Sequence, residues 1–338
     1  MQLTLNLNES SYEIIIEKGV LNSVGELIPR HNKFLLISDD KIPNQYIEIL
    51  KRQFSNIYVA RFPAGEASKT IQTFEALTDE LIKNEFTRKD AIIALGGGVT
   101  SDLAGYVASC YMRGIDFYII PTTLLSQTDA SIGGKVAVNH NGIKNIIGAF
   151  YQPKKVIIDP DTLKTLQPRL YNEGVAEIIK MAAIYDANLF EKLEKCTDFE
   201  ANIEEILYQA LLIKKDVVEK DEKEANLRSI LNFGHTVGHA IEAKGNGRFY
   251  HGEAVAIGMM YLSFGEAKSR IEALLRKYHL PVKDDYDNKE LLELIKLDKK
   301  AHDDKIKVVI VNKIGSYELK DISFSDLYQI MEGQKYEK

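Results

Sequence analysis

The segment Ala91-Ile-Ile-Ala-Leu-Gly-Gly-Gly-Val-Thr-Ser-Asp102 decides the fold class. Five apolar residues, three glycines and a helix-compatible stretch are typical of a strand, a tight turn and a helix. Glycines in such a turn let backbone N–H groups approach a phosphate, and the helix N-terminus favours negative charge. The third glycine comes too early for the G-x-G-x-x-G fingerprint. Phosphate binding is therefore one interpretation, and a bare turn that requires positive φ is the other.

Similar short apolar runs lie on both sides of this segment and alternate with helical patterns. The expected strands are Phe34–Ser38, Tyr58–Phe62, Ala91–Leu95, Phe117–Pro121 and Lys155–Asp159, and the helical stretches include Ile71–Asn84 and Asp102–Tyr111. This alternation favours a parallel sheet covered by helices on both faces. At the N-terminus, Leu3–Leu7 and Tyr12–Ile16 flank the turn-forming Asn8-Glu-Ser-Ser11 and predict a hairpin added to that sheet.

The second half of the chain is mainly helical. Its helical periodicity covers Asn172–Glu194, Ile203–Val218, His235–Ala243, Gly252–Ser269 and Lys289–Leu297. One strand pair remains plausible, Lys307–Val311 with Gly315–Leu319. We therefore expect an α/β domain over residues 1–160 and a mainly α-helical domain over residues 161–338, with ligands in the cleft between them.

Composition excludes several classes of protein. The 338 residues carry a formal charge of −6, which argues against nucleic acid as the main partner because phosphate binding needs a basic face. No apolar run has the ~18 residues of a membrane helix, and the first residues do not resemble a signal peptide. The two cysteines, Cys110 and Cys196, form no metal or redox motif, so a reducing cytoplasm is the simplest location.

Three histidines and a glutamate form a candidate metal set. His235 and His239 are four residues apart and share one face of a helix, and His251 precedes the next helix. Glu177 lies one helical turn before Lys180. Histidine with carboxylate suits a catalytic zinc that keeps one position open for water. Alternatively, the histidines are capping or core residues, but the glycines among them favour the functional interpretation, because glycine in a helix costs ~1 kcal/mol.

A long polar and basic run follows the expected strand that ends at Pro121 and extends to Gly148. We expect a long loop here, and a loop of this length usually has a function. Arg113, Lys135, Lys144 and Arg228 could together bind a phosphate or a carboxylate, although each taken alone is an ordinary solvated charge. Asp39, at the end of another expected strand, could accept ribose hydroxyls or be a solvated loop residue.

Taken in order, these segments resemble the 3-dehydroquinate synthase family over nearly the whole chain. The matching stretches are Pro63–Thr70, Gly96–Val99 with Asp102, Pro121–Leu125, Asp129 through Gly133-Gly-Lys135, Lys144-Asn145, Gly174–Lys180, Leu231–His239 and His251-Gly-Glu253. The resemblance implies a Rossmann-like N-terminal domain that binds NAD and a helical C-terminal domain that binds metal and substrate. It also implies a cytoplasmic enzyme of the shikimate pathway that is a homodimer.

The resemblance assigns residues to three groups. The metal ligands, for zinc or cobalt, would be Glu177, His235 and His251. The NAD contacts would be Asp39, Glu66, Lys69, Gly97, Gly98, Val99, Asp102, Thr122, Thr123, Lys135, Lys144, Thr162 and Thr165. The catalytic and substrate contacts would be Arg113, Asp129, Lys135, Lys144, Asn145, Lys180, Lys214, Arg228, Asn232 and His239. Either Lys299 or Lys300 would also reach the phosphate. Leu170 stands where the family often has Glu, which weakens a role for a carboxylate there.

The implied reaction converts 3-deoxy-arabino-heptulosonate 7-phosphate into 3-dehydroquinate and phosphate, with NAD reduced and reoxidised in each turnover. Asp39 would select NAD over NADP, since a 2′-phosphate would meet its carboxylate. Three alternatives remain: a sister cyclase for another sugar phosphate, a metal-dependent polyol dehydrogenase with net redox turnover, and a non-catalytic NAD-binding regulator. The Gly-Gly-Lys135 and Lys144-Asn145 elements favour the dehydroquinate branch, and a regulator would have broken metal ligands.

Overall fold

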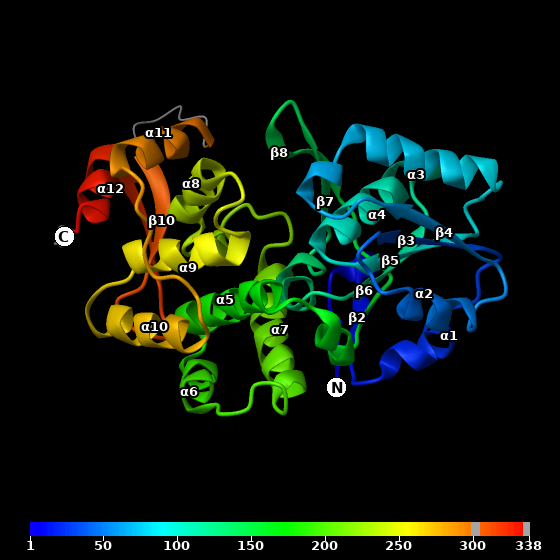
Figure 1. The fold of residues 1–338 in the computed structure, drawn as a ribbon, viewed down its shortest axis with the longest axis horizontal. Coiled ribbons are helices and arrows are strands. Elements are labelled where there is room, and N and C mark those ends of the chain that lie inside the picture. Colours follow the sequence, from blue (N-terminus) through cyan, green and yellow to red (C-terminus); the bar gives the residue numbers. More distant parts are fainter. Residues whose placement is uncertain (299–304, 334–338) are drawn as a thin grey trace. The chain divides into compact units, whose positions relative to one another are not determined.

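A computed structural model describes residues 1–298 and 305–333 of the chain and divides it into two units (Figure 1). The first unit contains residues 1–167 and 202–223, and the second contains residues 168–201 and 224–338. In the part of the chain that the structure describes, no helix is long and apolar enough to cross a membrane.

The first unit is built on a seven-stranded sheet in the order β1-β2-β9-β6-β5-β3-β4. The strands are β1 (Gln2–Leu5), β2 (Tyr12–Ile16), β3 (Phe34–Asp39), β4 (Ile57–Phe62), β5 (Ala91–Gly96), β6 (Asp116–Pro121) and β9 (Lys155–Ile158). Every pairing is parallel except that of β1 with β2. The expected parallel sheet with an added N-terminal hairpin is therefore confirmed.

Helices and one hairpin complete this unit. The helices are α1 (Val24–Leu27), α2 (Asn44–Lys51), α3 (Ile71–Lys83), α4 (Gly98–Cys110) and α7 (Ile203–Lys220), and the hairpin consists of β7 (Lys135–His140) and β8 (Ile143–Phe150). The polar run that we expected to be a long loop thus forms a π-helical turn at Ser126–Ala130 and this hairpin. The periodicity missed the hairpin because β8 has no buried face.

The order of the strands creates a switch point at the carboxyl edge of the sheet. β3 connects onward to β4 on one side, whereas β5 connects to β6 on the other. The loops after β3 and β5 therefore diverge, and ligands of doubly wound folds bind where such loops diverge. Asp39 and the glycine turn come directly after these two strands.

The second unit is mainly helical. It contains α5 (Pro168–Tyr185), α6 (Ala187–Lys195), α8 (His235–Gly245), α9 (His251–Tyr261), α10 (Gly265–Lys277), α11 (Asn288–Asp298) and α12 (Phe324–Met331), with β10 (Lys305–Ile310) paired antiparallel to β11 (Glu318–Ser323). The expected second strand at Gly315–Leu319 was placed too early. Gly315 instead has a φ of 80° in the connection between the two strands.

Two expected helices are each divided into two. The stretch Asn172–Glu194 breaks at Asp186, whose carboxylate accepts hydrogen bonds from the N–H groups of Asn188 and Leu189 and so begins α6. The stretch Gly252–Ser269 breaks where residues 262–264 pair with Val311 through backbone hydrogen bonds. In both places a local bond competes with helix continuation, which apolar periodicity alone does not reveal.

Candidate functional site

Three side chains of the second unit form a cluster suited to a metal ion. Glu177 lies within α5, and His235 and His251 are the first residues of α8 and α9. One ligand atom from each lies within 4.8 Å of the others, and each histidine Nε2 is 3.6 Å from Glu177 Oε1. One carboxylate and two imidazoles are a donor set for catalytic zinc or cobalt, so these residues fit the expected cation.

Glycines bring the two histidine-bearing helices together. A Cβ on Gly258 of α9 would lie 1.9 Å from the carbonyl oxygen of Gly234, and a Cβ on Gly238 of α8 would lie 2.9 Å from that of Ala254. Gly234 also adopts a φ of 77° just before His235. The glycines of the histidine motif therefore permit a close helix crossing and a left-handed start to α8.

Buried charges surround the cluster. The Glu177 carboxylate is fully buried, and the equally buried Lys180 ammonium, one turn further along α5, forms an ion pair with it. Burial and the Lys180 charge hold the pKa of His235 well below its usual range. Burial also lowers the pKa of His251, but hydrogen bonds and charges of Glu177 and Glu242 outweigh it and raise that pKa to about 10. The two imidazoles differ because His251 is near two carboxylates, whereas the effect of Glu177 on His235 is opposed by the Lys180 charge.

The other predicted residues of this unit lie at different depths. His239 is exposed, with its ring centroid 5.2 Å from that of His235 and 5.8 Å from that of His251. Arg228 is buried, and Asn232 donates a hydrogen bond of 3.5 Å to Glu224. Lys299 and Lys300 lie outside the described residues.

In the first unit, several residues predicted to contact NAD lie at the carboxyl edge of the sheet: Asp39, Gly97, Gly98, Thr122 and Thr123. Thr100 Oγ1, in the first turn of α4, donates a hydrogen bond of 3.4 Å to Asp39 Oδ2. A Cβ on Gly97 would lie 3.1 Å from the Thr123 side chain, and Thr122 N donates to Gly96 O. None of the three glycines has positive φ, so the bare-turn interpretation is wrong for this segment. Their backbone lies close to neighbouring side chains at the N-terminus of a 13-residue helix.

Lys69 joins residues predicted to contact NAD with one predicted to contact substrate. Its buried ammonium forms hydrogen bonds with Asp102 and Asn145. Burial raises the pKa of Asp102 to about 6, although the Lys69 charge lowers it. Asn139 of β7 links Glu66 to Asn145. Its side-chain N–H donates to Glu66 Oε1 at 2.8 Å, and its side-chain oxygen accepts from the backbone N–H of Asn145 at 2.8 Å. Sequence reasoning missed Asn139, because an asparagine in a strand has no motif of its own.

The remaining predicted residues of this unit are more scattered. Lys214 of α7 forms an ion pair with Asp129. Arg113 is exposed with a φ of 68°, and Lys135 and Lys144 are exposed on β7 and β8. Val99 lies in the first turn of α4. Thr162 accepts a hydrogen bond from Gln127, and Thr165 is 3.1 Å from the Tyr46 hydroxyl.

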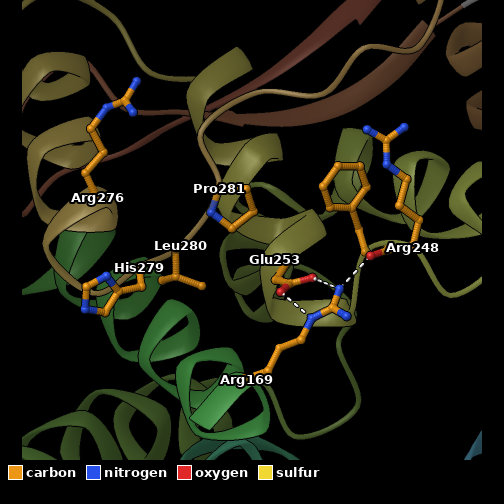
Figure 2. Close-up of a pocket in the computed structure, with 8 residues that line it drawn as sticks. Arg169, Arg248, Glu253, Arg276, His279, Leu280 and Pro281 are labelled. Atoms are coloured by element: carbon orange, nitrogen blue, oxygen red, sulfur yellow. Dashed lines mark hydrogen bonds and ion pairs between the residues drawn. The ribbon is translucent and has the colours of Figure 1, made fainter.

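A pocket of about 580 Å³ opens elsewhere in the second unit (Figure 2). Its lining residues are Arg169, Arg248, Phe249, Glu253, Arg276, His279, Leu280 and Pro281, none of which belongs to the predicted site. Figure 2 shows Arg169 bonded to Glu253, which also accepts from the N–H of Tyr250 just before His251. Arg169 thus supports the start of α9 through Glu253.

The fold of this chain, a mainly parallel sheet followed by a helical unit, is that of solved sugar phosphate cyclases. The structure of 2-deoxy-scyllo-inosose synthase complexed with carbaglucose-6-phosphate, NAD⁺ and Co²⁺ has a TM-score of 0.90, with 26% identity over 99% of this chain and 100% of that one. The 2-epi-5-epi-valiolone synthase of Streptomyces hygroscopicus, with NAD⁺ and Zn²⁺ bound, has a TM-score of 0.86 and 25% identity over 97% and 98%.

The chain belongs to the 3-dehydroquinate synthase family. Residues 59–173 match the N-terminal part of that family and residues 174–301 match its C-terminal part. The 3-dehydroquinate synthase of Enterococcus faecalis is 43% identical over 93% of this chain and 94% of its own length. The resemblance expected from the ordered motifs is therefore confirmed.

Proposed function

We propose that the protein converts 3-deoxy-arabino-heptulosonate 7-phosphate into 3-dehydroquinate and inorganic phosphate, and is thus a carbon–oxygen lyase. The observation that carries this proposal is the Glu177–His235–His251 cluster beside buried Lys180, in a chain that both parts of the family match. Relatives with NAD and cobalt or zinc bound support the same two cofactors here.

We propose that the second unit holds the cation through Glu177, His235 and His251. When bound, the cation would polarise a substrate hydroxyl as a Lewis acid. Lys180 is fixed by its ion pair with Glu177, so its ammonium is oriented to hold a substrate oxygen or to move a proton. His239 is exposed beside the cluster, where an imidazole can exchange protons with a substrate. Arg228 and Asn232 would supply hydrogen bonds to anionic groups.

We propose that the first unit binds NAD at the carboxyl edge of its sheet. When bound, NAD would take a hydride and return it within the same turnover. The N–H groups of Gly97 and Gly98 would hold the pyrophosphate, and Asp39 the ribose hydroxyls. Thr122, Thr123, Glu66 and Asp102 would complete the cofactor contacts. Lys135 and Lys144 would neutralise the anionic groups of the substrate, Asn145 would donate a hydrogen bond to them, and Lys214 would act through Asp129.

The decisive experiment supplies the heptulosonate phosphate with NAD far below the substrate concentration. We expect phosphate to be released over many turnovers while NADH absorbance stays near zero, because each hydride is returned. The control omits NAD after the protein has been stripped of cofactor. NADH formed in proportion to product, without phosphate release, would replace the proposal with a polyol dehydrogenase.

The sister cyclases are the second candidate, because two solved relatives belong to that group. This candidate is tested by supplying sedoheptulose 7-phosphate, which lacks the carboxylate of the heptulosonate phosphate. Turnover of that sugar in preference to the heptulosonate would favour the sister function. We also propose a cytoplasmic homodimer, and the two free thiols, Cys110 and Cys196, agree with a reducing compartment.

A further inference from the structure

Both histidines of the metal cluster have their Nδ1 atoms engaged. His235 Nδ1 is 3.2 Å from the carbonyl oxygen of Phe233, and His251 Nδ1 is 3.1 Å from Glu242 Oε2. A carbonyl and a carboxylate only accept hydrogen bonds, so Nδ1 is the donor in each ring. In each neutral ring the Nε2 lone pair is then left toward Glu177, where a cation would be bound.

The two rings are held by different kinds of partner. The partner of His235 is a backbone carbonyl two residues away, so no side-chain substitution removes it. The partner of His251 is a side chain on a neighbouring helix. Glu242 lies seven residues after His235 on α8, which places both on the same face after two helical turns. The glycine contacts between α8 and α9 bring that face to the start of α9.

Both members of the Glu242–His251 pair are partly shielded from water. Exposure is 20% for the Glu242 side chain and 29% for that of His251. Shielding strengthens a charge-assisted hydrogen bond and limits the rotation of the imidazole. A carboxylate bonded to the far nitrogen of a ligating histidine also makes the near nitrogen a better donor.

We propose that Glu242 is a positioning residue, which orients His251 and increases the affinity of the cluster for a divalent cation. This inference rests on the proposed function only in taking Glu177, His235 and His251 as metal ligands. It assigns Glu242 no contact with substrate. Loss of such a partner lowers metal affinity about 10- to 100-fold.

The test measures Zn²⁺ affinity of the metal-free protein by competition with a chelating dye, independently of activity. We expect Glu242→Gln to weaken Zn²⁺ binding about 10-fold, since its amide can still accept from Nδ1 but carries no charge, and Glu242→Ala about 100-fold. Glu290→Gln is the matched control. Glu290 of α11 is an exposed carboxylate that pairs with Lys244 of α8, the helix that carries Glu242.

Circular dichroism of the metal-free variants confirms that the fold is retained, and the nearly isosteric Glu242→Gln decides the matter if Glu242→Ala does not fold. Folded Glu242→Gln with a Zn²⁺ affinity within two-fold of Glu290→Gln would overturn the inference. Wild-type protein that binds no Zn²⁺ would overturn the inference together with the proposed metal site. Zn²⁺ binding without phosphate release would leave the inference standing and remove only the proposed reaction.

Discussion

At the scale of single residues, the candidate site depends on carboxylates that the fold shields fully or partly from water. Glu177 is fully buried between the two metal-site histidines and Lys180, and Asp102 faces Lys69. Asp102 makes stability depend on pH, because its protonation differs between the folded and unfolded chain.

Asp102 provides a direct test of this dependence. Its pKa is raised from 3.8 to about 6, so its contribution to stability is complete below pH 3.8 and is lost as the pH rises through about 6. Between about pH 5 and pH 8, wild type should lose about 1 kcal/mol of unfolding free energy relative to Asp102→Asn, which does not titrate there. Denaturant titrations at both pH values measure this difference, and a gain for wild type with rising pH would contradict the assignment.

Sequence motifs identified the metal-site residues better than they identified the residues that hold them in place. Helical spacing drew attention to His235 and His239, but the ligand set Glu177, His235 and His251 came from the ordered motifs of the family resemblance. Glu242 and Asn139 could not be found in this way, since each acts only through a partner that is distant along the chain and that the fold brings near. The neighbourhood of Lys69 was likewise visible only once β7 and β8 were in place.

At the scale of elements, the crossing of α8 and α9 fixes the metal cluster. His235 and His251 begin these two helices, so the separation of the helices sets the separation of the imidazoles. Gly258 sits where the two backbones come closest. A side chain at position 258 must push the helices apart, because the carbonyl oxygen of Gly234 belongs to the backbone and cannot rotate away.

We therefore expect Gly258→Ala to destabilise the protein by about 3 kcal/mol, as overpacking against a backbone oxygen does. Gly245→Ala at the end of α8 is the control. Its added methyl group would meet side-chain atoms and no backbone atom among its three nearest neighbours: the Tyr286 hydroxyl at 3.1 Å, Arg248 Cβ at 3.6 Å and Phe249 Cδ2 at 3.8 Å. Because the Tyr286 hydroxyl is the end of a side chain that can shift, this variant should change stability by less than about 1 kcal/mol. Chemical denaturation of both variants provides the measurement, and equal stabilities would show that the crossing is not tight.

Periodicity predicted elements more reliably than their ends or their neighbours. β3, β5, β6 and β9 were expected because buried parallel strands are short apolar runs. β4 was also expected, but it is an edge strand in which only Ala60 and Phe62 are buried. The breaks at Asp186 and at residues 262–264 were missed, since they depend on a cap and on a pairing with Val311. Helical periodicity over residues 203–218 predicted α7 but contains no information about the unit that α7 packs against.

At the scale of the whole molecule, the first unit is discontinuous in sequence. α7 follows residues of the second unit, yet it contacts β1, β2 and the turn at residues 126–130. It buries one apolar face and contributes Lys214 to Asp129 and Glu219 to Asn6. A helix from a later part of the chain thus covers β1 and β2 of the first unit.

A fragment that ends at residue 167 should consequently fail to unfold cooperatively, because it leaves the α7-facing side of β1 and β2 uncovered. Calorimetry of this fragment beside the full chain makes the comparison, with the full chain expected to show a distinct transition. A cooperative transition in the fragment with the midpoint of the full chain would show that α7 is dispensable.

The position of α7 also has a consequence for synthesis on the ribosome. Asn6 and Glu219 are 213 residues apart, so at about 5–20 residues per second the N-terminal hairpin waits roughly 10–40 s for its partner to be translated. During that time an apolar face remains available to other nascent chains. A cell producing this protein rapidly would therefore depend on chaperones that bind the emerging N-terminal half, and slower translation through residues 168–201 would lengthen the period of risk.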